Sequence, residues 1–194
     1  MIASIVLVAA LFAPGRSAPA TDSTRTPSSP TPTRPRATRE ARAPRPTPPA
    51  RAVLVADSIV VEKKLRRMTL YSHGTPVRRY NVALGGSPEG NKVRLGDRRT
   101  PEGLYRIDWR NPNSRFHRSL HISYPGPADL ARAASAGVPP GGAIMIHGLP
   151  RGYEDVGAAH VEVDWTDGCV AVTNDEVEEI WSAVPDGAAI QIKP

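Results

Sequence analysis

Hydrophobic and polar residues alternate in short runs along the chain from residue 58 onward. Runs with a period of two, bounded by Gly, Pro, Asn or Asp, are typical of β-strands that bury one face. The pattern predicts strands over residues 58–64, 67–71, 77–84, 104–109, 119–124, 143–147, 170–172 and 188–192. The first three follow one another closely through a turn at residues 73–76, so we expect them to form a meander.

Two segments predict helices. Residues 128–136 suit a short helix, and residues 174–184 suit a better-defined one. Thr173 and Glu176 have the spacing of a capping box at the start of the second helix, and Pro185 stops it. The apolar residues of this helix share one face, which we expect to pack on the sheet: Val177, Ile180, Trp181 and Val184. The sequence therefore predicts a mainly β fold, a closed or sandwiched β domain with two short helices.

The first 52 residues differ in composition from the rest. Residues 2–13 form a 12-residue apolar run, which is shorter than the roughly 20 residues of a membrane span and suits the core of a secretory signal. Ten prolines then lie between residues 14 and 50 among Thr, Ser and Arg, a composition that cannot bury a core. We expect a signal-like segment over 1–20, a disordered linker over 21–52 and a folded domain over 53–194. The protein would be exported to the periplasm or cell wall, with membrane contact only through an uncleaved signal.

The charge divides at the same boundary. The whole chain carries 25 basic and 19 acidic residues, a net charge of +6. The excess lies between residues 16 and 51, which hold 8 arginines and 2 acidic residues, while residues 52–194 are balanced. No aromatic residues are interleaved with these arginines and no nucleic-acid motif is recognisable, so we expect no nucleic-acid partner.

Cys169 is the single cysteine of the chain. One thiol cannot form an intramolecular disulfide, and exported proteins normally pair their cysteines, so this thiol is either an inert core residue or a reactive one. Gly168 allows a tight turn just before it, and His147 follows a strand-like run 22 residues upstream. A nucleophile, a base and backbone N–H groups for an oxyanion are the parts of an acyl-transfer site, and this favours the reactive alternative.

Residues 58–194 resemble the L,D-transpeptidase catalytic domain family, also called the YkuD domain. The resemblance rests on several short motifs in the family's order: residues 64–71, Val82-Ala83-Leu84-Gly85, Gly96-Asp97, residues 100–105, Ile144-Met145-Ile146-His147-Gly148 and Gly168-Cys169. It implies that Cys169 attacks a carbonyl of a peptidoglycan stem peptide and forms an acyl-enzyme, with His147 as general base. It also implies that the Gly148 carbonyl orients His147 and that the N–H groups of Gly168 and Cys169 hold the oxyanion. No cofactor or metal is implied.

Three positions depart from the family's usual pattern. Thr166, Asp167 and Ala171 stand where the family commonly has serine, histidine and arginine. The missing arginine removes a partner for a substrate carboxylate, and an anion at Asp167 is expected to raise the pKa of the Cys169 thiol. An amine acceptor would make the protein a transpeptidase. Water would make it an L,D-endopeptidase or amidase-type hydrolase, and an envelope protein could be the acceptor or leaving group.

Other residues offer alternatives. His160 is a rival base, but it lies in what we expect to be a mobile insertion, so His147 is preferred. His121 and Tyr124 are candidates for a substrate groove. A zinc hydrolase could use His147, His160, Asp164 and Cys169, although their spacing matches no recognised zinc pattern. A wall-binding module without activity would leave Cys169 inert.

Overall fold

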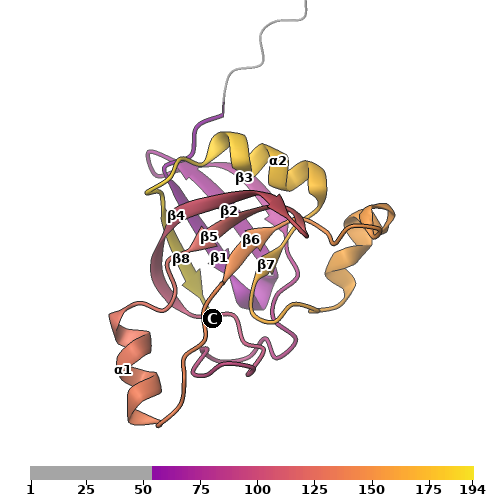
Figure 1. Ribbon diagram of the computed structural model, residues 1–194. Helices are drawn as coiled ribbons and strands as arrows, with labels where there is room; N and C mark the ends of the chain where they lie inside the picture. The colour runs from indigo at the N-terminus through magenta and orange to yellow at the C-terminus, as the bar shows by residue number, and fades with distance from the viewer. Residues whose placement is uncertain (1–53) are drawn as a thin grey trace, which may run out of the picture. The chain divides into compact units, whose positions relative to one another are not determined.

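The computed structural model describes residues 54–194. The predicted signal-like segment and linker lie outside the described residues. Eight strands form one sheet in the order β3-β2-β1-β8-β4-β5-β6-β7 (Figure 1). They are β1 (Ser58–Glu62), β2 (Arg67–Ser72), β3 (Thr75–Asn81), β4 (Gly103–Ser114), β5 (His117–Ile122), β6 (Met145–His147), β7 (Val170–Ala171) and β8 (Ala189–Lys193).

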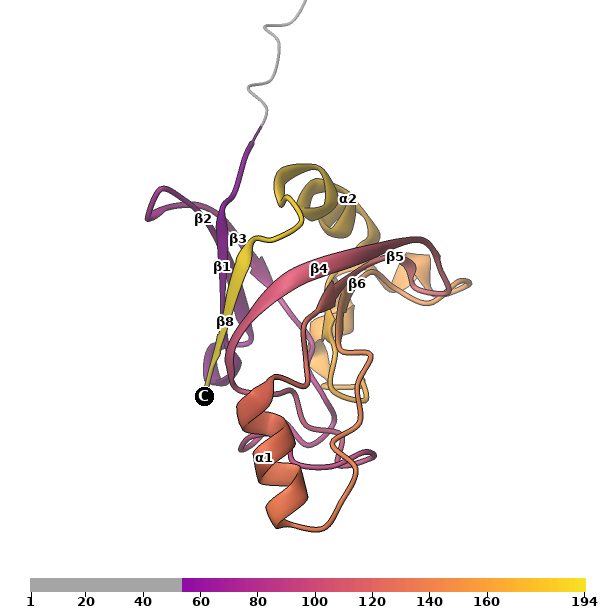
Figure 2. The same cartoon turned by 60° about the vertical axis from the view of Figure 1, so that its left-hand side comes forward.

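The sheet curls because its longest strand, β4, joins two halves. One half contains β3, β2, β1 and β8, and the other contains β5, β6 and β7. The residues Gly103–Arg106 of β4 pair with β8, whereas its later residues pair with β5 through a ladder interrupted by irregular register. Figure 2 shows β4 bending over from one half to the other. Apolar side chains from both halves meet inside this curl and are almost fully buried, among them Ile59, Leu70, Ile107, Leu120, Ile146 and Ile190.

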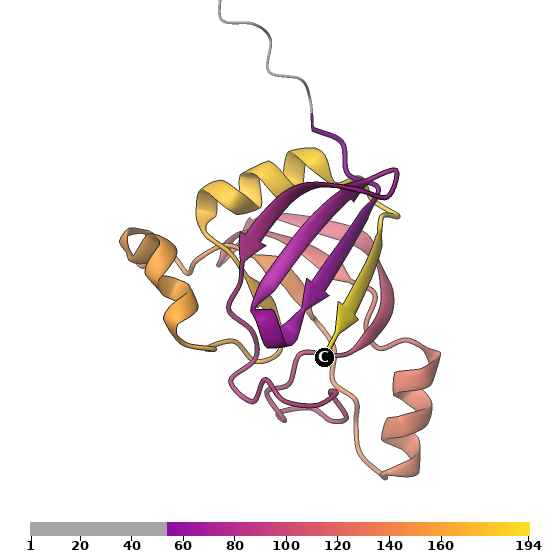
Figure 3. The same ribbon diagram turned by 180° about the vertical axis from the view of Figure 1, so that it is seen from behind.

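Two parallel pairings bring distant parts of the chain together. The last strand, β8, lies parallel to the first, β1, with Ser58 opposite Ala189. Figure 3, from behind, shows β8 in yellow beside the purple strands. The short strands β6 and β7 are also parallel, and they form one edge of the sheet. Sequence patterns predict strands but not their partners, so neither pairing was expected.

The helix α2 (Asn174–Ala183) crosses one end of the curled sheet (Figure 1). The predicted capping box is confirmed: Glu176 N donates to Thr173 Oγ1 at 3.3 Å, and Thr173 N donates to a Glu176 carboxylate oxygen at 2.8 Å. Trp181 packs against the core, as predicted. The helix α1 (Pro127–Ser135) starts with proline at its first turn and lies apart from the curl (Figure 2). Within residues 54–194, no helix has the length and apolarity that crossing a membrane requires.

The mainly β fold with two α-helices is confirmed, and two short 3-10 helices add to it. The predicted first strand ends two residues early because η1 (Lys63–Leu65) follows it. Lys63 is buried there, where its Nζ donates to Glu102 at 2.7 Å and to the Gly90 carbonyl oxygen at 2.6 Å. The expected insertion after β6 contains η2 (Glu154–Glu162), which is kinked at Gly157.

Candidate active site

The parallel pairing of β6 and β7 brings His147 and Cys169 to the same place. His147 is the last residue of β6 and lies opposite Ala171, while Cys169 immediately precedes β7. Because side chains alternate along a strand, Cys169 and Ala171 belong to the face that His147 occupies. Both residues line one cavity of about 770 Å³. The juxtaposition that the sequence predicts is therefore present.

Aromatic residues enclose the imidazole of His147. The ring of Phe116 stacks on it with centroids 4.3 Å apart, and Trp165 meets it edge-on at 5.6 Å. The side chain of His147 is 2% exposed. Two aromatic neighbours and near-complete burial restrict the imidazole to one orientation.

The Gly148 carbonyl determines the tautomer of His147. His147 Nδ1 lies 2.7 Å from Gly148 O. A carbonyl only accepts hydrogen bonds, so Nδ1 carries the proton, and Nε2 of the neutral ring is left as the acceptor. Burial lowers the pKa of His147 to about 4, although the hydrogen bond to Gly148 opposes this change. At neutral pH the ring is uncharged and can take a proton at Nε2.

Gly148 itself is packed too tightly for a larger residue. A Cβ at this position would lie 2.5 Å from Asn174 Oδ1 and 3.1 Å from the carbonyl oxygen of Phe116. The same Asn174 oxygen accepts a hydrogen bond from Leu149 N at 2.8 Å. The start of α2 therefore holds the backbone that orients His147.

The thiol of Cys169 is partly exposed and points at backbone. Its Sγ lies 3.7 Å from the carbonyl oxygen of Ala143, a residue with a left-handed φ of 53°. Burial raises the pKa of the Cys169 thiol, a hydrogen bond from the Met145 backbone opposes this, and the Asp167 charge raises the pKa further. Asp167 thus changes the pKa of the thiol in the direction that the sequence predicts, but burial is the larger cause of the raised pKa. The thiol is protonated at neutral pH.

Thr166 holds the turn that presents Cys169. Its buried Oγ1 donates to the Cys169 carbonyl oxygen at 2.8 Å and accepts from Gly168 N at 3.1 Å. Gly168 has φ = 126°, and a Cβ there would lie 2.6 Å from Arg99 O, so only glycine fits. The Gly168 N–H, which the resemblance assigns to an oxyanion hole, is therefore engaged within the turn.

An ion pair that the sequence did not predict anchors the segment leading to this turn. Asp164 accepts from Arg66 Nη2 at 2.7 Å with one carboxylate oxygen and from Leu84 N at 2.9 Å with the other. The two partners of the ion pair lie 98 positions apart, and no local pattern marks such a pair.

The proposed zinc ligands are not gathered together. Asp164 is engaged with Arg66, and His160 lines a different cavity of about 540 Å³, which shares Trp165 with the cavity of Cys169. In the part of the chain that the structure describes, no three His, Cys, Asp or Glu residues are arranged to hold a metal ion. His147 is the histidine that lies beside Cys169 in this cavity.

Of the remaining candidates, Asp167 lines the cavity, whereas His121 and Tyr124 do not. His121 pairs with Asp108 at 2.6 Å and stacks on Trp109, and it is Trp109 that lines the cavity. Tyr124 is buried, and its hydroxyl donates to the Pro140 carbonyl oxygen at 2.9 Å, outside the cavity lining. Asp167 lines the cavity and is 89% exposed, with Arg98 Nε 3.5 Å from its Oδ1.

Sequence reasoning missed the cations of the cavity. Lys92, Arg98 and Arg115 line it together with Asp167. They come from two loops, one before β4 and one between β4 and β5. Loop residues follow no periodic pattern, and each of these cations is ordinary by itself in a chain with 25 basic residues.

Comparisons with known proteins find related sequences and similar folds. YafK of Escherichia coli (strain K12), whose name carries the term L,D-transpeptidase, is 31% identical over 108 residues, covering 54% of this chain and 36% of YafK. The chain thus matches only about a third of that relative's length. Pgp2 of Campylobacter jejuni, a helical cell shape determining protein, has a similar fold: TM-score 0.53, 21% identity, 73% of this chain and 51% of Pgp2. A mutant form of Pgp2 gives a TM-score of 0.54 at 22% identity, covering 73% of this chain and 48% of that one. The model of the L,D-transpeptidase catalytic domain, YkuD, matches residues 56–192, and the chain therefore belongs to this family.

Proposed function

We propose that this protein is a cysteine-dependent acyltransferase of the L,D-transpeptidase type that acts on peptidoglycan stem peptides. The observation that carries the proposal is the position of His147 beside Cys169 in one cavity, with Nδ1 committed to the Gly148 carbonyl. A base whose tautomer is fixed, next to a single thiol, is the arrangement that nucleophilic catalysis needs.

The first half-reaction transfers the acyl group to sulfur. Nε2 of His147 takes the thiol proton as Cys169 Sγ attacks the peptide carbonyl carbon, and the carbonyl oxygen becomes an oxyanion. The Cys169 N–H is the proposed donor to this oxyanion, because the Gly168 N–H is engaged by Thr166. As the C–N bond breaks, the imidazolium returns its proton to the leaving amine, and a thioester remains on Cys169.

The second half-reaction decides between transfer and hydrolysis. An incoming amine attacks the thioester while Nε2 takes its proton. The C–S bond then breaks as the new amide forms, and the imidazolium gives the proton to sulfur, which restores the thiol. Water in place of the amine gives a free carboxylic acid, which is the hydrolase alternative. Both routes use the same two side chains and differ only in the acceptor.

Purified sacculi test the proposal. They are incubated with the full chain, and the bonds made and broken are read by mass spectrometry. New cross-links indicate transfer, cleaved links indicate hydrolysis, and Cys169→Ala should produce neither. A protein that binds sacculi and leaves every bond unchanged would be a wall-binding module and would contradict the proposal.

A histidine pair supplies the matched control. His147→Ala should slow acylation by a factor on the order of 100 or more, the usual size of a lost general base. His160→Ala removes the histidine of the neighbouring cavity and should change the rate little. Equal losses in the two variants would show that His147 is not the specific base.

A further inference from the structure

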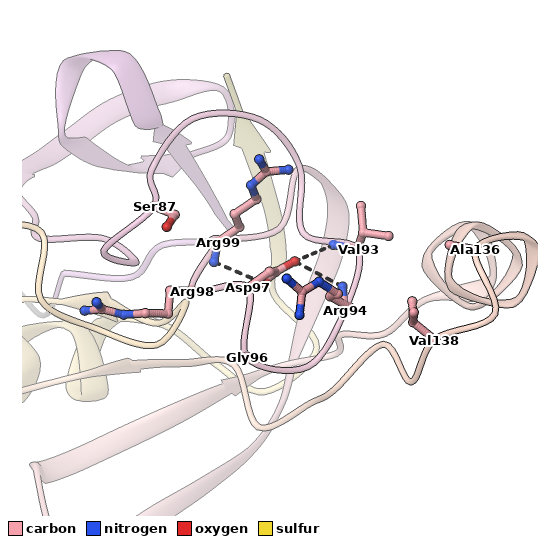
Figure 4. Close-up of a pocket in the computed structure, with 9 residues that line it drawn as sticks. All are labelled: Ser87, Val93, Arg94, Gly96, Asp97, Arg98, Arg99, Ala136 and Val138. Carbon is pink, nitrogen blue, oxygen red and sulfur yellow. Dashed lines mark hydrogen bonds between the residues drawn. The ribbon is translucent and has the colours of Figure 1, made fainter.

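A second cavity, of about 450 Å³, adjoins the catalytic cavity (Figure 4). Gly96 and Arg98 line both cavities, so the two share a wall at this loop. Three arginines of one loop line the second cavity, namely Arg94, Arg98 and Arg99, and their side chains leave the loop in different directions (Figure 4). Ala136 and Val138, which follow α1, supply an apolar wall.

Asp97 also lines this cavity, but its carboxylate does not neutralise the arginines. Both carboxylate oxygens of Asp97 are occupied, by the Nζ of buried Lys92 at 2.7 Å and by the backbone N–H groups of Val93, Arg94 and Arg99. Figure 4 shows the three backbone hydrogen bonds converging on this carboxylate. Lys92 matches the negative charge of Asp97, and Asp167 of the neighbouring cavity lies 3.5 Å from Arg98 Nε, so Arg94 and Arg99 leave this cavity with a net positive charge.

The loop is shaped around Arg98. A Cβ on Gly85 would lie 2.2 Å from Arg98 O, and a Cβ on Gly86 would lie 2.4 Å from Arg98 Nη2. The guanidinium therefore lies across Gly86 in space that a larger residue would fill. Arg98 also adopts a left-handed φ of 54°, which is unfavourable for a residue with a side chain, and Ser87 N donates to its carbonyl oxygen at 3.0 Å. Gly86 thus leaves room for this guanidinium, and the close approach of Gly85 and the Ser87 hydrogen bond fix the Arg98 main chain between the two cavities.

We propose that the second cavity is a carboxylate-binding subsite, in which Arg94 takes a free carboxylate of the peptide substrate and Arg98 stands at the border with the catalytic cavity. Guanidinium groups bind carboxylates through paired, charge-assisted hydrogen bonds. The apolar wall suits a small aliphatic group next to that carboxylate. That the ligand is a peptide rests on the proposed function. The subsite would determine which peptides the protein selects for that same reaction.

The test compares two synthetic stem peptides that differ in one group, a C-terminal carboxylate or a C-terminal amide. Their binding to the full chain carrying Cys169→Ala is measured by titration calorimetry, so that no turnover is needed. The amide should bind about tenfold more weakly than the acid, the size of one lost charge-assisted contact. Arg94→Gln, which alters a residue of the second cavity alone, should reduce this ratio to about two or less.

The matched control is Arg79→Gln, which removes an exposed arginine of β3 and the same charge. It should keep the tenfold ratio. An acid-to-amide ratio near one in the parent protein, or an equal loss in both arginine variants, would overturn the subsite. Competition by inorganic phosphate at concentrations where acetate has no effect would also overturn it, in favour of a phosphate site. Failure of the proposed function would appear differently. The protein would still bind the acid peptide more tightly than the amide peptide, but neither peptide would acylate Cys169 of the wild-type protein.

Discussion

The pKa values of His147 and Cys169 move in opposite directions from their ordinary values, and both changes favour the neutral side chain. Burial lowers the pKa of His147 to about 4 and raises the pKa of the Cys169 thiol. The resting pair is therefore an imidazole and a thiol, not an imidazolium and a thiolate. In the proposed reaction, proton transfer therefore has to accompany attack on the substrate, which is the role of a general base.

This resting state predicts the pH dependence of thiol labelling. The rate of Cys169 alkylation by iodoacetamide should rise through pH 9.0, the ordinary value for a thiol, without levelling off below it. Asp167→Asn removes a neighbouring anion and should shift the profile to lower pH. Mass spectrometry of the labelled protein measures both profiles. A plateau reached below pH 7 would mean that a thiolate-imidazolium pair exists in the resting protein.

Thr166 allows a test of the turn that presents Cys169. Thr166→Val keeps the shape but leaves the buried Gly168 N–H without its acceptor, at a cost of about 1–3 kcal/mol in the free energy of unfolding. Thr166→Ser restores the hydroxyl and should recover most of this loss. Urea unfolding measures both variants. Equal stability of the valine and serine variants would show that the hydrogen bonds of Thr166 contribute little.

At the scale of elements, the loop between β3 and β4 depends on one buried ion pair. Lys92 and Asp97 are 3% and 9% exposed in their side chains and lie 2.7 Å apart. Burial alone would raise the pKa of Asp97, but the hydrogen bonds from Lys92 and from three backbone N–H groups outweigh it and lower the pKa to about 2. The loop thus has its own polar core.

Breaking this pair should be costly. Asp97→Asn leaves Lys92 buried without a counter-charge and should destabilise the protein by about 3 kcal/mol near pH 7. The native pKa lies below the ordinary 3.8, so the stabilisation is complete above pH 3.8 and is lost as the pH falls toward 2. Urea unfolding at several pH values measures this, with Lys92→Met/Asp97→Asn as the control that removes both charges. A constant difference between wild type and Asp97→Asn down to pH 2 would contradict the assignment.

Local patterns predicted those elements whose cause is local. The α2 helix was predicted to within a residue because Thr173, Glu176 and the apolar face lie within one segment. The end of β1 was missed because Lys63 turns inward to reach Glu102, 39 positions away. For the same reason the Asp164–Arg66 pair and the cations of the cavity were not foreseen, whereas His147 and Cys169 were, since each stands in a short motif.

At the scale of the whole molecule, charge and chemistry lie in different parts of the chain. The net charge of +6 comes from the arginine-rich stretch before residue 52, and the rest of the chain is balanced. This division predicts separable roles, with the arginines acting through long-range attraction to an anionic wall.

Deletion of residues 21–50 tests this division. The shortened protein should keep its activity on soluble stem peptides and bind less well to whole sacculi, with the difference disappearing at high salt because exposed charges are screened. Co-sedimentation at several salt concentrations measures retention, and replacement of the arginines by glutamine in the same residues is the control. Loss of activity on soluble peptides would show that this stretch contributes to the site.

The parallel alignment of β6 with β7 has a consequence for how such a protein can diversify. His147 and Cys169 lie 22 positions apart along the chain, and they meet because β6 and β7 are in register. A shift of one residue between these strands would turn the thiol to the opposite face, away from His147, and abolish the proposed acyl transfer. By contrast, η2 (Glu154–Glu162) lies outside the paired residues of β6 and β7. Changes in the length or sequence of η2 can therefore alter what approaches the thiol without shifting the register that brings His147 and Cys169 together.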